Sequence, residues 1–255
     1  MQNHFIYLDI GDTVIHLKKK PGELYLDLFI SFGKDLSGIE KGRANESFLN
    51  AWKEMDRLYA TEDFADRYRK HKNGSIGFWF ELIERFCQKL QIQDITNNEK
   101  MEIYKTFETK EVWFVEPSFF DLVELSQQRK ISLGVLSNWD SRLRIILENL
   151  GIFQYFSEMV ISGEFGWEKP SPRIFQEAER RAGLSGEKIL YTGDKVEMDY
   201  RPSQKLGWKS FLFKRQWQLE NQTKKGFLDG FEGDIIGKLD EVPGMSMNYI
   251  DDKQP

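Results

Sequence analysis

The chain has 255 residues, of which 40% are hydrophobic and 30% charged, and its 41 acidic and 36 basic residues give a net charge of −5. This composition is that of a folded globular protein, and the length suits a core domain that carries an insertion. The negative charge disfavours nucleic acid as the main partner, because polyanion binding needs a concentrated basic surface.

The cellular setting is predicted from what the sequence lacks. Cys87 is the single cysteine, so no disulfide forms within the chain. The first residues show no basic stretch followed by a long apolar run, and no apolar run approaches the roughly 18 residues of a membrane span. We therefore expect a cytoplasmic protein with no membrane partner, and the sequence leaves its oligomeric state open.

Short apolar runs in the N-terminal and C-terminal parts of the chain predict buried strands. Residues 5–10 carry Asp9 near the end of the first run, and similar runs follow later in the chain, at residues 131–136, 159–161, 189–192 and 211–213. Helical patterns lie between these runs. Strands that alternate with helices predict an α/β fold with a doubly wound parallel sheet that is covered on both faces.

Residues 17–112 lack this alternation and are predicted to form four amphipathic helices with aromatic stripes. We interpret the stripes as a bundle interior, with Cys87 as a core thiol. The predicted organisation is a catalytic core of residues 1–16 and 113–255 and a helical cap domain of residues 17–112. Near the C-terminus we expect a short strand and helix over residues 234–242 and a loose tail over residues 245–255.

Polar side chains follow three of the predicted strands. Asp9 closes the first, Ser137 and Asn138 follow the second, and Asp194 follows another. Ligands of open parallel sheets bind outside the carboxyl ends of the strands, so these residues are expected to converge on one site.

At these positions the chain resembles the haloacid dehalogenase superfamily, whose members are mostly phosphatases. The family motifs are D-x-D-x-T, a Ser or Thr that closes a strand, a Lys, and a Gly-Asp pair followed by a further Asp. The matching residues here are Asp9-Ile10-Gly11-Asp12-Thr13, Ser137, Lys169, and Gly193-Asp194 with Asp199. The segments around Ser137, Lys169 and Asp194 are most similar to the branch of haloacid dehalogenase-like domain proteins of the third type.

The resemblance implies that Asp9 attacks phosphorus and forms an aspartyl-phosphate. One pair of like charges about 4 Å apart costs roughly 4 kcal/mol at an effective dielectric of 20, so a cation must accompany the carboxylates and the phosphate. Mg²⁺ prefers such oxygen ligands. Its expected ligands are Asp9, Asp194, Asp199 and the Gly11 carbonyl. Lys169, Ser137 and the amides near Asn138 are expected to bind the phosphoryl oxygens, and Asp199 is also expected to hold Lys169.

Gly11 departs from the motif, because most phosphatases of the family have there the Asp that protonates the leaving oxygen. General acid catalysis is worth about 10² to 10⁴ in rate, so its loss predicts slow hydrolysis or a need for good leaving groups. Asp12 is a candidate substitute, although a turn role suits it better. His16 and His71 are further candidates, and surface positions are expected for both.

Two basic clusters are candidates for substrate steering or selection. Residues 18–20 are three lysines at the passage from core to cap, and a second group lies in the cap at Arg67, Arg69, Lys70 and Lys72. A charge run of this kind is more often a solvated face.

The sequence favours a magnesium-dependent phosphatase of a small phosphorylated metabolite. Two alternatives stay open. A dehalogenase needs no acid at Gly11, but the carboxylates around Asp194 would repel its carboxylate substrate. A degenerate enzyme that only binds a phosphorylated ligand would also retain these charged residues.

Overall fold

A computed structural model describes residues 4–184, 186–220 and 231–243. Its centre is a six-stranded sheet in the order β5-β4-β1-β6-β7-β8, and every pair of neighbouring strands is parallel. The strands are β1 (Phe5–Leu8), β4 (Ser132–Ser137), β5 (Phe156–Ile161), β6 (Ile189–Gly193), β7 (Lys209–Phe213) and β8 (Ile235–Ile236). The predicted fold class is confirmed.

The sheet is buried on both faces, as the apolar runs predict. All four residues of β1 are buried, and successive side chains alternate between two clusters. Phe5 and Tyr7 face one cluster, and Ile6 and Leu8 face the other.

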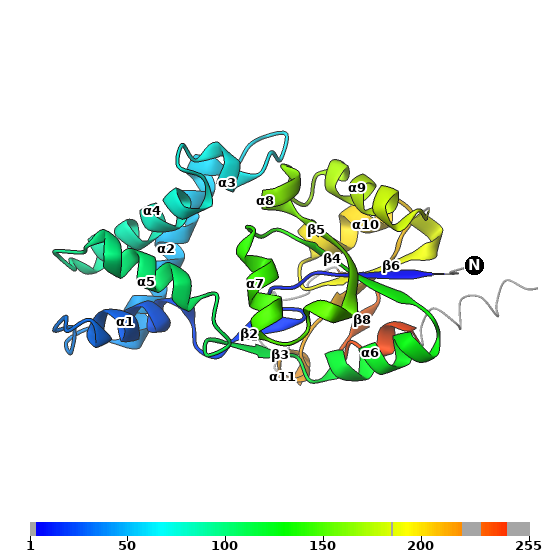
Figure 1. Ribbon diagram of the computed structural model, residues 1–255, viewed down its shortest axis with the longest axis horizontal. Coiled ribbons are helices and arrows are strands. Elements are labelled where there is room, and N and C mark those ends of the chain that lie inside the picture. Colours follow the sequence, from blue (N-terminus) through cyan, green and yellow to red (C-terminus); the bar gives the residue numbers. More distant parts are fainter. Residues whose placement is uncertain (1–3, 185, 221–230, 244–255) are drawn as a thin grey trace, which may run out of the picture.

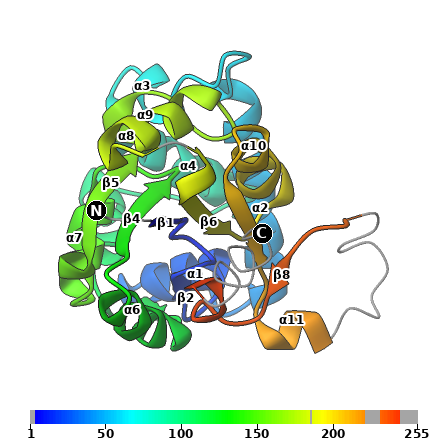
Figure 2. The ribbon, with the colours of Figure 1, turned by 90° about the vertical axis from the view of Figure 1, so that its right-hand side faces the viewer.

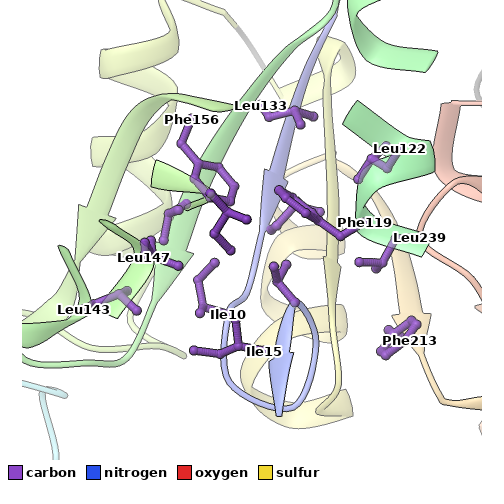
Figure 3. Close-up of a cluster of buried hydrophobic side chains, with 14 of the residues drawn as sticks. Ile10, Ile15, Phe119, Leu122, Leu133, Leu143, Leu147, Phe156, Phe213 and Leu239 are labelled. Atoms are coloured by element: carbon purple, nitrogen blue, oxygen red, sulfur yellow. The ribbon is translucent and has the colours of Figure 1, made fainter. Parts of the chain in front are cut away.

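Helices cover both faces of this sheet (Figure 2). One side carries α6 (Ser118–Gln128) and α7 (Arg142–Asn149), and the other carries α9 (Pro172–Ala182) and α10 (Arg201–Lys205). Figure 3 shows Phe119 of α6 and Leu147 of α7 packed with strand residues such as Leu133. Burying a side chain of this size contributes about 1.5–3 kcal/mol. The remaining elements of the core are η1 (Phe153–Tyr155), α8 (Ser162–Phe165), η2 (Gly186–Lys188), η3 (Val196–Tyr200) and α11 (Gln216–Glu220).

A two-stranded antiparallel ribbon connects the sheet to a group of helices. Its strands are β2 (Ile15–Leu17) and β3 (Trp113–Val115), with Leu17 opposite Trp113. Between them the chain forms α1 (Pro21–Ser31), α2 (Lys41–Tyr59), α3 (Arg67–Lys70), α4 (Gly74–Leu90) and α5 (Asn97–Thr106). These helices gather beside the sheet (Figure 1) around a hydrophobic cluster of their own.

The helical region has one element more than predicted. The short helix α3 begins where the Asp66 carboxylate accepts hydrogen bonds from the amides of Tyr68 and Arg69, a capping pattern that apolar periodicity does not reveal. Cys87 is buried in the helical cluster, as predicted. Over residues 234–242 the strand β8 is present, and the predicted tail of residues 245–255 lies outside the described residues. Within the described part of the chain, no helix is both long and apolar enough to cross a membrane.

Candidate active site

The carboxyl ends of the central strands bring four of the predicted residues together. Asp9 follows β1, Ser137 ends β4, and Asp194 follows β6. Lys169 comes from the loop between α8 and α9. Asp9, Ser137 and Lys169 are almost fully buried, with exposed fractions of 6%, 1% and 2%. Residues far apart in the sequence therefore share one site because their strands are neighbours in the sheet.

Lys169 is the centre of the hydrogen-bond network. Its ammonium group lies 2.9 Å from Asp9 Oδ1, 2.6 Å from Asp199 Oδ1 and 3.0 Å from the Tyr191 hydroxyl. Burial opposes the charge of Lys169, but the carboxylates of Asp199 and Asp9 outweigh it and raise its pKa. The Ser137 hydroxyl donates to the same Asp9 oxygen at 2.8 Å. Asp9 is thus held in a fixed orientation by two neighbours.

Asp199 is positioned by the local backbone. It lies in the π-helical turn η3, and its Oδ2 accepts a hydrogen bond from the Lys195 amide at 2.9 Å. Gly193 makes room for it, since a Cβ on Gly193 would lie 2.4 Å from Asp199 Cγ. The contact with Lys169 agrees with the positioning role that the sequence predicts for Asp199.

Three carboxylates form a cluster that fits a metal ion. Oxygen atoms of Asp9, Asp194 and Asp199 all lie within 4.8 Å of one another. Asp194 Oδ1 is buried without a hydrogen-bond partner, an arrangement that is costly unless a ligand satisfies it. Burial, followed by charges including that of Asp9, raises the pKa of Asp194 to about 7, and burial also raises the pKa of Asp9. A hard divalent cation would bind the unpartnered Asp194 oxygen and would stabilise the ionised forms of Asp9 and Asp194. The roles of Asp9, Asp194, Asp199 and the Gly11 carbonyl as metal ligands stay predictions.

The side chain of Asn138 binds the backbone of Lys169. Its side-chain nitrogen donates to the Lys169 carbonyl at 2.9 Å, and its side-chain oxygen accepts from the Lys169 amide at 2.6 Å. The side chain therefore fixes the backbone of Lys169. Only the Asn138 amide is left for the predicted contact with phosphate.

The space beside Gly11 is filled by Trp139. A Cβ built on Gly11 would lie 2.9 Å from the far edge of the Trp139 ring. Asp12 occupies the left-handed backbone region with a φ of 59°, and its side chain is 73% exposed. The nearby His16 imidazole, whose Nδ1 lies 3.9 Å from Asp12 Oδ1, lowers the pKa of Asp12, so its carboxyl group is ionised and is no proton donor at neutral pH.

Our expectation of surface positions for the two histidines is wrong. His16 is 1% exposed on β2 and lies 3.2 Å from Glu116. His71 is 8% exposed and lies 3.4 Å from Glu81 in the helical region. Neither lines the cavity at Asp9, so neither replaces the missing acid. Both are buried through long-range packing that a short window of sequence does not show.

Several side chains of the two basic clusters bind other parts of the protein. Arg67 forms a two-pronged ion pair with Glu168 in the core, and Arg69 donates to the carbonyl of Gly163. The Lys70 ammonium donates to backbone carbonyls of α2 and its C-terminal cap, and Lys19 pairs with Asp27 at 2.7 Å. Arg67 and Arg69 join the helical region to the core, so the hypothesis that this cluster selects the substrate is not supported.

A cavity of about 260 Å³ extends from Asp9 toward the helical region. Its lining includes Asp9, Ser137, Lys169 and Asp199 at one end. Much of the remaining wall is aromatic and includes Trp52, Tyr68, Trp79, Trp113 and Trp139. Part of the aromatic stripes that we interpreted as bundle interior therefore faces this cavity.

With the geometry known, the sequence was compared with known proteins. A model of the haloacid dehalogenase-like hydrolases matches residues 6–207. The chain belongs to this family. Haloacid dehalogenase-like hydrolase domain-containing protein 3 of Homo sapiens is 28% identical over 214 residues, covering 83% of this chain and 82% of the human protein. The branch predicted from the motifs is thereby confirmed.

This hydrolase is also similar to part of a phosphatase and to two solved structures. Glyceraldehyde 3-phosphate phosphatase of Methanopyrus kandleri is 39% identical over 80 residues, 31% of this chain and 32% of that protein. The HAD-hydrolase YfnB of Bacillus subtilis, solved bound to magnesium, has a TM-score of 0.70 at 16% identity and covers 97% of this chain and 100% of its own. The L-2-haloacid dehalogenase RSc1362 has a TM-score of 0.67 at 14% identity, with the same coverage. The fold alone does not separate phosphatase from dehalogenase.

Sequence reasoning missed several residues of the hydrolase's cavity. Trp139 and Arg142 follow β4, directly after the motif residue Ser137. Lys195 follows Asp194 and also lines the cavity. The proximity of these residues to the motifs is the signal that could have identified them.

Proposed function

We propose that this hydrolase is a magnesium-dependent phosphatase that acts on a small phosphorylated metabolite through an aspartyl-phosphate on Asp9. The observation that carries the proposal is the partnerless, buried Asp194 oxygen beside Asp9. A cluster of three carboxylates suits a site that holds Mg²⁺ and a phosphoryl group. The partial similarity to a phosphatase and the magnesium found with YfnB support the same reading.

The proposed reaction has two steps, with Asp9 as the nucleophile of the first. The Asp9 carboxylate attacks phosphorus as the ester P–O bond breaks, and the leaving oxygen takes a proton from water. A second water then attacks the aspartyl-phosphate and releases inorganic phosphate. Lys169 and Ser137 orient Asp9 and offer donors to the phosphoryl oxygens, and Asp199 fixes Lys169. Mg²⁺, held by Asp9 and Asp194, supplies positive charge that offsets the negative charge on the phosphoryl oxygens.

Gly11 is the observation that favours the alternatives, since neither a dehalogenase nor a pure binder needs an acid there. Against a dehalogenase stands the acidic cluster, because the negative field around Asp194 would repel a haloacid. A measurement of halide release distinguishes a dehalogenase from a phosphatase.

The first test combines turnover with metal binding. Release of phosphate from 4-nitrophenyl phosphate should require Mg²⁺, disappear with EDTA, and fall at least 10³-fold in Asp9→Asn. Mg²⁺ at 100 times its Kd should stabilise the wild type by about 2.7 kcal/mol. Asp194→Asn should lose this stabilisation, whereas Asp121→Asn, an exposed carboxylate on α6, should keep it. Halide release from 2-chloropropionate without phosphate release would show a dehalogenase. Mg²⁺-dependent stabilisation without turnover of either substrate would show a binder.

A further inference from the structure

The cavity at Asp9 has one charged end and one aromatic end. Asp9, Lys169 and Asp199 form the charged end. The aromatic end is built by both parts of the chain, with Trp52 and Trp79 from α2 and α4 and Trp113 and Trp139 from the core. Several of these rings support one another, since the centroids of Trp52 and Trp79 lie 5.8 Å apart and those of Trp113 and Trp139 lie 5.6 Å apart. Such walls bind flat apolar groups.

The aromatic end offers no uncommitted cation to a second anionic group. Among the described residues, the cations that line the cavity are Lys169, Lys195 and Arg142. Lys169 pairs with Asp9 and Asp199, and Lys195 follows Asp194 in the sequence, so both lysines belong to the charged end. The charge of Arg142 is already paired, because its guanidinium binds both oxygens of Asp140 and also donates to the Tyr104 carbonyl. The Trp79 indole N–H is also used, donating to Asp140 at 2.6 Å. A carboxylate or a second phosphate on the leaving group would therefore be buried without a partner.

The chemistry beside Gly11 sets a second condition on the leaving group. The edge of the Trp139 ring occupies the space next to Gly11, so no side chain from that position protonates the leaving oxygen. An alcohol must then leave as an alkoxide, although an alcohol is about as weak an acid as water. A phenol leaves as a phenolate with a pKa of about 10 and needs far less help.

Size gives the third condition. A cavity of about 150 Å³ is enough to hold one benzene ring. The cavity here measures about 260 Å³, which leaves room for a phosphoryl group beside one such ring.

From these three conditions we infer that the substrates are aryl phosphates: monoesters of a single-ring phenol without a second anionic group. This inference rests on the proposed function. The P–O bond to the ring oxygen breaks as Asp9 bonds to phosphorus, and the phenolate takes its proton from solvent. The preference comes from the aromatic wall during binding and from the phenol's acidity during bond cleavage.

The test compares the hydrolysis of one acyl phosphate and three phosphate monoesters by the full-length protein with Mg²⁺. Acetyl phosphate reports on the phosphoryl site alone. Phenyl phosphate has the ring and the acidic leaving group, benzyl phosphate has the ring but an alcohol leaving group, and glycerol 3-phosphate has neither. We expect kcat/KM for phenyl phosphate to exceed that for glycerol 3-phosphate at least 100-fold, with benzyl phosphate between them. Equal values for phenyl and glycerol phosphates beside good turnover of acetyl phosphate would overturn the inference and leave the phosphatase intact.

Analogues that cannot be hydrolysed measure how much the ring contributes to binding, independently of bond cleavage. Phenylphosphonate should compete at least tenfold more tightly than methylphosphonate, measured by calorimetry with Mg²⁺. If none of the four compounds is turned over, the proposed function fails, and this comparison alone decides whether the aromatic end binds a ring. Equal affinities for the two phosphonates overturn the inference in either case.

A pair of variants on α2 tests the wall itself. Trp52 lines the cavity, and Lys53 is exposed on the same helix. Trp52→Leu should raise KM for phenyl phosphate about tenfold. Lys53→Leu should leave this KM unchanged. An unchanged KM for phenyl phosphate in Trp52→Leu contradicts the proposed wall.

Discussion

At the scale of single residues, Gly11 and Trp139 are complementary. The edge of the indole ring lies where a side chain at position 11 would begin. Placing an acid at position 11 therefore also requires a change in Trp139. Trp139 in turn is packed against Trp113, with ring centroids 5.6 Å apart. A side chain at position 11 would therefore require the Trp139 ring to shift.

This complementarity predicts how an acid can be restored. Gly11→Asp alone should lose about 1–3 kcal/mol of unfolding free energy, because the new side chain and the ring compete for the same space. Gly11→Asp combined with Trp139→Ala should relieve that clash and raise kcat for benzyl phosphate about 10- to 100-fold over Trp139→Ala alone. Urea denaturation and phosphate release measure the two effects. A Gly11→Asp single variant as stable as the wild type would refute the steric account.

At the scale of elements, the helical region is tied to the core beside the catalytic lysine. Arg67 begins α3 and binds both carboxylate oxygens of Glu168, the residue before Lys169. The two side chains are 11% and 4% exposed, so the pair is largely desolvated. This ion pair therefore joins the helical region to the loop that carries Lys169.

A double-mutant cycle tests this connection. Arg67→Met should cost about 3–5 kcal/mol, because Glu168 is left as a buried, unpaired carboxylate. Adding Glu168→Gln should recover part of that loss, giving a coupling of about 0.5–3 kcal/mol. Arg57→Met, an exposed arginine on α2, serves as the matched control and should change stability by less than about 0.5 kcal/mol. Additive losses in the urea-unfolding cycle would show that the pair does not connect the two regions.

At the scale of the whole molecule, the helices leave and rejoin the core through one ribbon. Leu17 and Trp113 are opposite each other on β2 and β3, and the Lys18 amide still bonds to the Val112 carbonyl. The helices also have a hydrophobic cluster separate from those of the sheet. These observations support the proposal that residues 17–112 are an inserted cap domain.

The ribbon predicts that the cap can be removed. Replacing residues 18–112 with Asn-Gly joins Leu17 to Trp113 by a two-residue turn of the kind that connects antiparallel strands. The shortened protein should still unfold cooperatively on heating and hydrolyse acetyl phosphate with Mg²⁺. Its preference for phenyl over glycerol phosphate should fall at least tenfold, because Trp52 and Trp79 are gone. A shortened protein that folds yet keeps the full preference would show that the cap does not select substrates.

The sequence by itself determined the alternating strands and helices, the position of the helical insertion, and the edge of the sheet at which Asp9, Ser137 and Asp194 meet. These are local properties, because apolar periodicity and the order of parallel strands place them without knowledge of distant contacts. Lys169 and Asp199 were found by resemblance to the family motifs. Tertiary structure alone decided that Trp139 fills the space at Gly11, that His16 is buried, and that Arg67 pairs with Glu168. Each of these depends on side chains that are far apart in the sequence or on the direction in which a ring points, and residue spacing carries no information about either.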